Sequence, residues 1–366
     1  MSYTTSMADI QKQVVLAPYT SFGLGGPAEH FVEVHSSDEL ITVLKRTTAQ
    51  PIWLLGYGSN TLISDKGLPG LTVVLHGGAM EFTENRVVAD AGVWWDSIVQ
   101  AAIDRNLWGV EFLSYIPGSL GAALYINITA YGQSIGPRVE WVDIWNPSTL
   151  QVERMDTAVL LWDYKQSVFQ QPTYQQAVIL RACLILSNRQ TDELLYQKAV
   201  DVASELHLDM HSLQDRRKII YEARLQAGSI WDPSSHEHRT VGSFFRNPLV
   251  DPATAERIIA YDESGKTALE IKKMNQVHGG SAQRVSAAHV MLAAGFKRGQ
   301  RWGQVKLNDQ NLLKIEALEG ATAQDVYTLM RHIQDTCLAS IGVKLEPEAR
   351  ILGSFTVEAE NPQQTS

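Results

Sequence analysis

Residues 51–75, PIWLLGYGSNTLISDKGLPGLTVVL, place a glycine loop between two apolar runs. The run that ends at Gly56 predicts a short buried strand, and the residues from Thr61 onward again have extended, β-type character. In a Rossmann phosphate loop the glycines follow the pattern G-x-G-x-x-G and open a helix. Here Thr61 stands in place of the third glycine and a strand follows it. The stretch therefore does not match the Rossmann fingerprint and predicts a strand, a loop and a second strand.

Helices and strands alternate around this loop, which indicates a mixed fold. Ser36 and Glu39 have the spacing of a capping box at the start of a helix. Helical spacing also recurs in three other places: residues 94–109, residues 192–215, and residues 322–342, where Thr322 would cap the helix and Gly342 end it. In the first of these, Trp94 and Trp95 are expected in the core rather than against a cofactor. Strands are predicted for RVVADAG, VEWVDIWNP and AVILRACLILS.

The bulk composition indicates a globular protein of more than one domain. The chain has 366 residues, of which 45% are hydrophobic and 19% charged, so two or three domains are expected. The N-terminus lacks the pattern of a signal peptide, and no run of about 18 apolar residues occurs, which predicts a cytoplasmic protein without membrane insertion. Cys183 and Cys337 stand in apolar surroundings and are expected to be buried, reduced thiols.

The charge pattern argues against nucleic acid as a partner. The net charge is −9, whereas binding to phosphate backbones needs a local excess of Lys and Arg. Two basic clusters occur, and each is either a solvated basic face or a site for a small anion such as a diphosphate. They consist of Arg216, Arg217 and Lys218, and of Lys297, Arg298, Arg301 and Lys306.

Three further features have two explanations each. Residues 111–138 are rich in Gly, Ala and Ser, which suits either close approach of a ligand to the backbone or a tightly packed core. His236 and His238 lie in a loose stretch near a predicted domain boundary at residues 228–239, and without a third ligand they do not predict a metal site. Ser243 in VGSFFRNP is either a turn residue or a reactive hydroxyl.

Six separated motifs together resemble the UDP-N-acetylenolpyruvoylglucosamine reductase family, flavoenzymes of peptidoglycan precursor synthesis. They occur in the family's order and cover nearly the whole chain. The motifs are TSFGLGGPAEHF (20–31), LLGYGSNTLISDKGLPG (54–70), IPGSLGAALYINITAYGQSIG (116–136), GSFFRNP (242–248), AGFKRG (294–299) and LEPEARILG (345–353).

The resemblance implies an α+β fold. It consists of an FAD-binding fold of the vanillyl-alcohol oxidase type, with two lobes, and a C-terminal α+β substrate-binding domain. The implied domains are an N-terminal FAD-binding lobe at residues 1–73 with the tail 353–366, a second FAD-binding lobe at 74–226, and a substrate-binding domain at 227–352. The sequence carries no signal for an oligomeric state.

The resemblance also implies the reaction and the site. NADPH would reduce FAD, and the flavin would pass a hydride to the enolpyruvyl group of a UDP-sugar. Ser243 would then protonate the carbon next to the carboxylate as a general acid. Glu348 and the residue at position 165 would stabilise the enolate. The residues expected to hold FAD are Gly56, Tyr57, Gly58, Ser59, Asn60, Pro117, Gly118, Ser119, Gly121, Ala122, Tyr131, Gly132 and Arg350. Those expected to hold the substrate are Tyr164, Tyr196, Asn247 and Lys297.

The chain departs from the family pattern at several positions. Lys165 stands where the family has arginine, and a lysine keeps the charge but loses the planar fork that grips a carboxylate. Thr129, His289 and Ser229 replace the usual glycine, tryptophan and lysine. These departures keep open a catalytically impaired flavin- or nucleotide-binding homologue, and a related flavin oxidase is a further alternative. A tyrosine of a mobile substrate loop in one class of the family could correspond to Tyr196, or Tyr196 could be an apolar-face residue of a helix.

Overall fold

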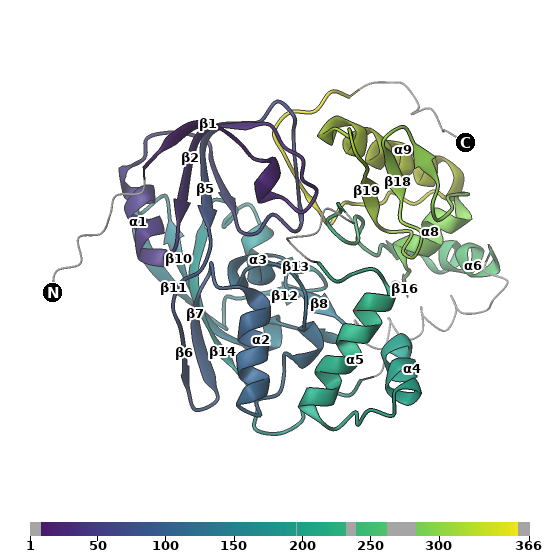
Figure 1. Ribbon diagram of the computed structural model, residues 1–366, viewed down its shortest axis with the longest axis horizontal. Coiled ribbons are helices and arrows are strands. Elements are labelled where there is room, and N and C mark those ends of the chain that lie inside the picture. Colours follow the sequence, from purple (N-terminus) through teal and green to yellow (C-terminus); the bar gives the residue numbers. More distant parts are fainter. Residues whose placement is uncertain (1–8, 195, 232–238, 262–282, 358–366) are drawn as a thin grey trace. The chain divides into compact units, whose positions relative to one another are not determined.

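The computed structural model describes residues 9–194, 196–231, 239–261 and 283–357 (Figure 1). The chain forms two compact units, and each unit is assembled from separate stretches of sequence. Unit 1 contains Met1–Val14, Ala28–Gly58 and Pro69–Trp231, and unit 2 contains Val15–Pro27, Ser59–Leu68 and Asp232–Ser366. The glycine loop at residues 56–60 therefore passes from unit 1 to unit 2 after Gly58. The predicted division into three domains stays a prediction.

The two apolar runs that flank the glycine loop form strands, as predicted, and the structure shows that these strands are neighbours. They are β3 (Ile52–Leu55) and β5 (Leu68–Leu75), which pair in parallel with Ile52 opposite Leu71. Their sheet has the order β1-β2-β5-β3, with β1 (Gln11–Val15) and β2 (Pro27–Val34). The predicted strand after the loop also forms, as β4 (Thr61–Ile63), but it pairs with β20 (Arg350–Leu352). The Ser36 hydroxyl accepts the Glu39 N–H and begins α1 (Ser37–Arg46).

The second sheet of unit 1 is antiparallel, with the order β11-β10-β14-β7-β6. The predicted strands VEWVDIWNP, AVILRACLILS and RVVADAG contribute its three central members. Its strands are β6 (Met80–Thr83), β7 (Arg86–Asp90), β10 (Val139–Asn146), β11 (Gln151–Asp156) and β14 (Val178–Ile185). The short elements of unit 1 are β8 (Thr129–Ala130), β9 (Gln133–Ser134), β12 (Trp162–Asp163) and β13 (Gln166–Ser167), with the 3-10 turns η2 (Glu111–Leu113), η3 (Gly136–Arg138) and η4 (Val168–Gln170).

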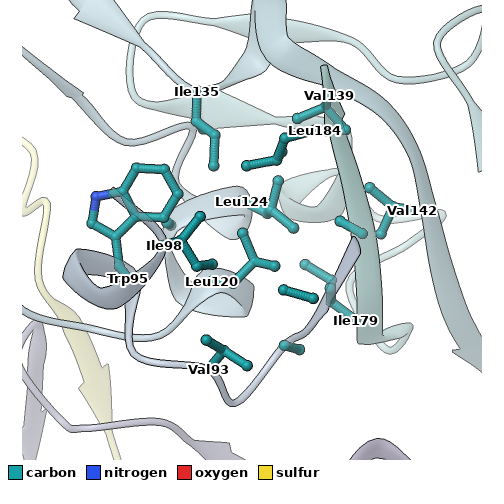
Figure 2. Close-up of a cluster of buried hydrophobic side chains, with 14 of the residues drawn as sticks. Val93, Trp95, Ile98, Leu120, Leu124, Ile135, Val139, Val142, Ile179 and Leu184 are labelled. Carbon is teal, nitrogen blue, oxygen red and sulfur yellow. The ribbon is translucent and has the colours of Figure 1, made fainter. Parts of the chain in front are cut away.

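The core of unit 1 lies where two helices meet the second sheet. The predicted helix after β7 is α2 (Trp95–Asp104), and its apolar face is buried as expected. The short α3 (Leu120–Tyr125) places Leu120 and Leu124 between Ile98 of α2 and the side chains of β10 and β14 (Figure 2). Burial of each such side chain contributes roughly 1.5–3 kcal/mol. This packing fixes the loop that leads into α3, because the helix is held on both sides.

The predicted helix between residues 192 and 215 is wrong in its extent. Residues 192–194 are not helical, and α4 (Gln197–Glu205) begins only after Tyr196. A longer helix, α5 (Leu213–Gln226), starts where the predicted one was to end, with Ser212 as its N-cap. The two helices run side by side (Figure 1). In the connection between α4 and α5, the Asp209 N–H donates to the Asp215 carboxylate. Side chains that bond nearby backbone groups in this way compete with helical hydrogen bonds, so the polar residues of the connection end α4 and begin α5.

The first basic cluster belongs to α5 and is not an open anion site, although Lys218 is solvated. Arg216 is 1% exposed, and its Nη1 lies 2.7 Å from Glu111 Oε1, which is fully buried. The Arg216 Nε donates to the Met210 carbonyl at 2.6 Å. Arg217 forms an ion pair with Asp96, and Lys218 pairs with Asp215 at the surface. Each of the three cations therefore has its own carboxylate.

Replacing Glu111 by glutamine is expected to lower the free energy of unfolding by about 3 kcal/mol, because the buried Arg216 loses its counter-charge. The control is Asp335→Asn, which removes an exposed pair with Arg331 and is expected to cost less than about 1 kcal/mol. Urea unfolding followed by circular dichroism measures both variants. Equal losses in the two would contradict a structural role for the buried pair.

Unit 2 is built around α9 (Ala323–Ile341), which matches the predicted final helix. Thr322 and Asp325 form a reciprocal capping box, and Gly342 ends the helix with a left-handed φ of 79°. The other elements are η1 (Ala17–Tyr19), β15 (Leu249–Val250), α6 (Pro252–Tyr261), β16 (Gln283–Arg284), α8 (Ala287–Ala293), β17 (Arg301–Trp302), β18 (Val305–Leu307) and β19 (Ile315–Ala317). Strands β17, β18 and β19 form an antiparallel sheet.

The cysteines are buried and unbonded, as predicted. Burial raises the pKa of Cys183 to about 12, and its Sγ donates to Glu140 at 3.2 Å. Burial likewise raises the pKa of Cys337 to about 12. Both thiols stay protonated near neutral pH, so neither is activated as a nucleophile.

Candidate active site

The first glycine loop is anchored in unit 1 by His76. The ring nitrogen Nε2 of His76 lies 3.0 Å from the Gly56 carbonyl oxygen, and its ring stacks on Tyr57 with centroids 4.2 Å apart. Gly58 has a φ of 59°, the left-handed region that glycine enters without steric cost. Burial raises the pKa of Tyr57, and a hydrogen bond with the backbone of Gly77 opposes that shift. The loop is thus held in a defined conformation before it enters unit 2.

The second glycine loop, residues 117–122, meets the first loop within unit 1. A Cβ added at Gly56 would lie 2.8 Å from Ser119 Oγ, so the two loops approach more closely than side chains allow. Ser119 also caps α3 by accepting the Ala122 N–H at 3.3 Å. Position 121 requires glycine for a different reason, since a Cβ added there would lie 2.9 Å from the Cβ of Ala91. The packing explanation for the small residues therefore holds at Gly121, and the explanation by close approach of a ligand stays a prediction.

Gly56→Ala is expected to weaken FAD binding about tenfold, because relieving overpacking of this size costs about 1–3 kcal/mol. Quenching of flavin fluorescence during titration of the apoprotein measures the dissociation constant. A cycle with Ser119→Ala isolates the contact, since removing Oγ makes room for the new methyl group. Additive effects of the two substitutions would show that the loop-to-loop contact does not set the affinity.

Aromatic side chains line the first loop. Trp94 meets the Tyr57 ring edge-on at 4.6 Å, and Trp231 lies 5.7 Å from Trp94. The prediction that Trp94 and Trp95 are core residues is right for Trp95, which is fully buried and donates to the Leu113 carbonyl. It is wrong for Trp94, which is half-buried and pairs with Ser119 of the second glycine loop in an isolated bridge.

A polar clamp fixes the start of the second loop. Tyr115 has a φ of 59°, which is strained for a residue with a side chain. Its N–H donates to Asp96 Oδ1 at 2.6 Å, and Arg217 grips both oxygens of that carboxylate at 2.8 and 2.7 Å. The Arg217 guanidinium also lies 4.0 Å above the Tyr115 ring. The ion pair of α2 and α5 thus holds the backbone just before Pro117.

Tyr131 and Gly132 form the two-residue turn between β8 and β9. Their φ values of 52° and 86° match the type I′ geometry of tight hairpins. Burial raises the pKa of Tyr131, while the charge and hydrogen bond of Arg224 oppose that shift. Thr129, one of the departures from the family pattern, lies in β8 and donates to the Asn127 carbonyl. Tyr131 is therefore placed by backbone geometry and by its interaction with Arg224.

Tyr164 and Lys165 occupy the corresponding turn between β12 and β13. Lys165 has a φ of 54°, and its carbonyl accepts from Gln170 Nε2 at 3.3 Å. The turn is tied to the region before β8, since Asn127 donates to the Asp163 carbonyl at 2.7 Å. Tyr196 caps α4 rather than lying on its face, so the helix-face alternative is wrong. It is 51% exposed and meets the Tyr131 ring edge-on at 5.1 Å.

Unit 2 joins the predicted catalytic segments by backbone hydrogen bonds. The Phe244 N–H donates to the Leu313 carbonyl at 2.7 Å, and the Phe244 carbonyl accepts the Glu348 N–H at 2.8 Å. Asn60 connects to the same ladder, because its side chain donates to the Glu348 carbonyl and its carbonyl accepts the Arg350 N–H. The structure thus gathers the segments of Ser243, Glu348, Arg350 and the end of the first glycine loop in one unit.

The remaining substrate candidates of unit 2 lie near α8. Asn247 Oδ1 accepts the Ala287 N–H at 3.0 Å, so this side chain supports the start of the helix. Lys297 is exposed after α8. Sequence reasoning missed Lys314, which is 2% exposed and bridges to Ser243 in an antiparallel pair. The histidine pair His236 and His238 lies outside the described residues. Within the part of the chain that the structure describes, no helix is long and apolar enough to cross a bilayer.

The described residues fit a bound dinucleotide of the FAD type. Gly56 and Gly58 in the first loop, and Gly118 and Gly121 in the second, carry no side chain, and such glycines let a phosphate group approach the backbone closely. The first loop follows β3 and leads into β4 without the Rossmann pattern, which sets it apart from the phosphate loop of the NAD-binding class. Fold and site together define an FAD-dependent oxidoreductase.

Comparisons with known proteins give the family. Residues 28–150 match the FAD binding domain model, and residues 232–352 match the C-terminal domain of UDP-N-acetylenolpyruvoylglucosamine reductase. The reductase of Thermobifida fusca is 30% identical over 96% of this chain and 99% of its own. The reductase of Mycobacterium leprae is 29% identical over 94% of this chain and 96% of its own. The chain belongs to the UDP-N-acetylenolpyruvoylglucosamine reductase family.

The fold agrees with this assignment. The crystal structure of the UDP-N-acetylenolpyruvylglucosamine reductase from Thermus caldophilus superposes with a TM-score of 0.65 and 22% identity, covering 94% of this chain and all of that one. The α+β prediction, with an FAD-binding part followed by the reductase's C-terminal domain, is confirmed.

Proposed function

We propose that this protein uses NADPH to reduce UDP-N-acetylenolpyruvoylglucosamine to UDP-N-acetylmuramate, a cytoplasmic step of peptidoglycan synthesis. Family membership supports the reaction, since the Thermobifida fusca relative carries that name across its full length. The observation that carries the proposal for this chain is the ladder of unit 2. It joins the segment of Ser243 to that of Glu348 and to Asn60, at the end of a flavin loop.

FAD bound at this site would supply the hydride chemistry that links NADPH to the enolpyruvyl double bond. Holding FAD falls to the two glycine loops, with Gly56, Gly58 and residues 117–122 offering close backbone approach. Tyr131, Gly132, Ser59, Asn60 and Arg350 complete the proposed set. The clamp of Asp96 and Arg217 supports this role, because it fixes the backbone that leads into the second loop.

Ser243 is the proposed general acid. Hydride addition leaves carbanionic character on the carbon next to the carboxylate, and a hydroxyl within reach supplies the proton. Phe244 and Phe245 follow it and are 0% and 2% exposed, so the segment is packed into the core on one side. Gly242 precedes Ser243 with a φ of 80°, and this turn sets where the serine stands. Water exclusion favours protonation by Ser243 over solvent.

Glu348 and Lys165 are proposed to act at the substrate carboxylate end, and Tyr164, Tyr196, Asn247 and Lys297 to bind the sugar nucleotide. Glu348 is half-buried, with its backbone fixed on both sides by Phe244 and Asn60. The strained φ of Lys165 supports a functional role, because such strain persists where the surroundings require that conformation. The single ammonium group of Lys165 supplies a positive charge but does not hold a carboxylate by two parallel hydrogen bonds as arginine does.

Lys165→Arg is expected to raise kcat/KM for the sugar nucleotide about tenfold, because a second hydrogen bond to the carboxylate is worth about 1.4 kcal/mol. Steady-state kinetics at saturating NADPH measure the change. Lys12→Arg, an exposed exchange in β1, is the matched control and should leave the value unchanged. Unchanged turnover in Lys165→Arg would show that lysine serves as well as arginine here.

The proposed function is tested by following NADPH absorbance with the FAD-loaded protein, with and without UDP-N-acetylenolpyruvoylglucosamine. We expect NADPH loss that depends on the sugar nucleotide. Loss that depends only on oxygen would support a flavin oxidase instead. Bound FAD that NADPH does not reduce would support a catalytically impaired flavin-binding homologue.

A further inference from the structure

One face of the β18–β19 pair in unit 2 carries buried polar side chains. The register sets Lys306 opposite Glu316 and Leu307 opposite Ile315, and the Asn308 N–H donates to the Lys314 carbonyl. Since side chains alternate along a strand, Leu307 and Ile315 point into the core on the other face. Asn308, Lys314 and Glu316 are only 3%, 2% and 5% exposed. We call Lys306, Asn308, Lys314 and Glu316 the polar strip.

The polar strip is connected by hydrogen bonds and charge. Asn308 Nδ2 donates to Glu316 Oε1 at 2.7 Å, and Lys306 Nζ lies 3.4 Å from Glu316 Oε2. Lys306 is partly exposed and also pairs with Asp309 at 2.7 Å. The strip therefore includes a group in contact with water at Lys306 and, two residues before Glu316, the buried side chain of Lys314.

Lys314 lies beside Ser243. The two residues pair in an isolated antiparallel bridge. The Phe244 N–H, one residue after Ser243, donates to the carbonyl of Leu313, one residue before Lys314. Ser243 and Lys314 thus form the non-hydrogen-bonded type of pair, with Cα atoms about 4.5 Å apart and side chains on the same face. A lysine this buried is rare and is normally paired, so its place beside Ser243 is a specific feature of this segment.

We propose that Lys314 is a positioning residue that supplies protons to Ser243. The Ser243 O–H bond breaks and its proton joins the substrate carbanion, whose electron pair forms the new C–H bond. At the same time an N–H bond of Lys314 breaks, and that proton passes to the serine oxygen. The serine ends unchanged and Lys314 ends as a neutral amine. Solvent reprotonates it by way of the polar strip. The inference rests on the proposed function, since it assigns a source for the proton of that reaction.

The experiment separates the two half-reactions by anaerobic stopped-flow absorbance of the flavin. In Lys314→Met and Lys314→Arg we expect reduction by NADPH at the normal rate. Reoxidation by the sugar nucleotide should slow at least about tenfold in both, because neither side chain delivers a proton as lysine does. Lys344→Met, which removes an exposed lysine of unit 2, should match the unaltered protein in both half-reactions. The circular dichroism spectrum and the bound flavin of each variant report folding.

The outcomes distinguish this inference from the function on which it rests. Reoxidation within about twofold of the unaltered protein in either Lys314 variant would overturn the inference, and the arginine variant decides it if the methionine variant does not fold. Equal slowing of both half-reactions would also overturn it, since that is the result of a purely structural role. Failure of the sugar nucleotide to reoxidise the flavin of the unaltered protein would contradict the proposed function itself.

Discussion

Ser243→Ala is expected to slow reoxidation of the reduced flavin by the sugar nucleotide about 10²–10⁴-fold, the usual contribution of a positioned general acid. Reduction of the flavin by NADPH should keep its rate, because that step needs no proton from Ser243. The Phe244 backbone bonds to the Leu313 carbonyl and the Glu348 N–H do not involve the hydroxyl, so the segment should remain in place. Stopped-flow absorbance of the flavin measures both steps.

The matched control is Ser340→Ala. Ser340 is exposed on α9, and its hydroxyl donates to the Thr336 carbonyl of its own helix. It should leave both half-reactions unchanged. If the two alanine variants reoxidise at the same rate, Ser243 is a turn residue and the proton comes from elsewhere.

Glu348→Gln is expected to lower the same reoxidation rate about 10²–10³-fold, the loss typical when a group that stabilises transition-state charge is altered. The substitution keeps the size of the side chain, and the backbone contacts with Phe244 and Asn60 are unaffected. FAD affinity should therefore stay the same. Single-turnover kinetics with prereduced enzyme measure the rate, and fluorescence titration measures the affinity.

Glu346→Gln serves as the control for that change. Glu346 lies two residues earlier, is exposed, and takes part in the ladder through its carbonyl, which accepts the Arg246 N–H. Its amide variant should turn over normally. A parallel loss in Glu346→Gln would mean that general negative charge near this segment matters, rather than a group at position 348.

Local patterns predicted most of the regular structure. Helix α9 forms as expected, because Thr322, Asp325 and Gly342 fix its ends by capping that depends on near neighbours only. The strands around the first glycine loop also form where predicted. The pairing of β4 with β20 could not be predicted, because it joins residues 61–63 to residues 350–352 and depends on how the whole of unit 2 assembles.

The errors arise where tertiary partners decide the role of a residue. Arg216 and Arg217 appear in the sequence as a basic cluster, yet their partners Glu111 and Asp96 lie more than a hundred residues away. Trp94 and Trp95 are neighbours in a helical pattern, but only Trp95 faces the core. The charge and hydropathy of a segment cannot disclose such partners.

The resemblance named the segments of the candidate site but did not name Lys314. The resemblance proposes Ser243 and Glu348 as site residues, and the structure joins their segments in one ladder. Lys314 was missed, because it belongs to no motif of the resemblance. A signal did exist, since KIEA alternates charged and apolar residues as a strand with one polar face does.

The measurement that tests the central claim most directly is mass spectrometry of the sugar nucleotide after anaerobic incubation with the FAD-loaded protein and NADPH. We predict that UDP-N-acetylenolpyruvoylglucosamine gains a hydride and a proton and becomes UDP-N-acetylmuramate, in equal amount to the NADPH consumed. Recovery of the unchanged sugar nucleotide, with NADPH consumed only when oxygen is admitted, would contradict the account.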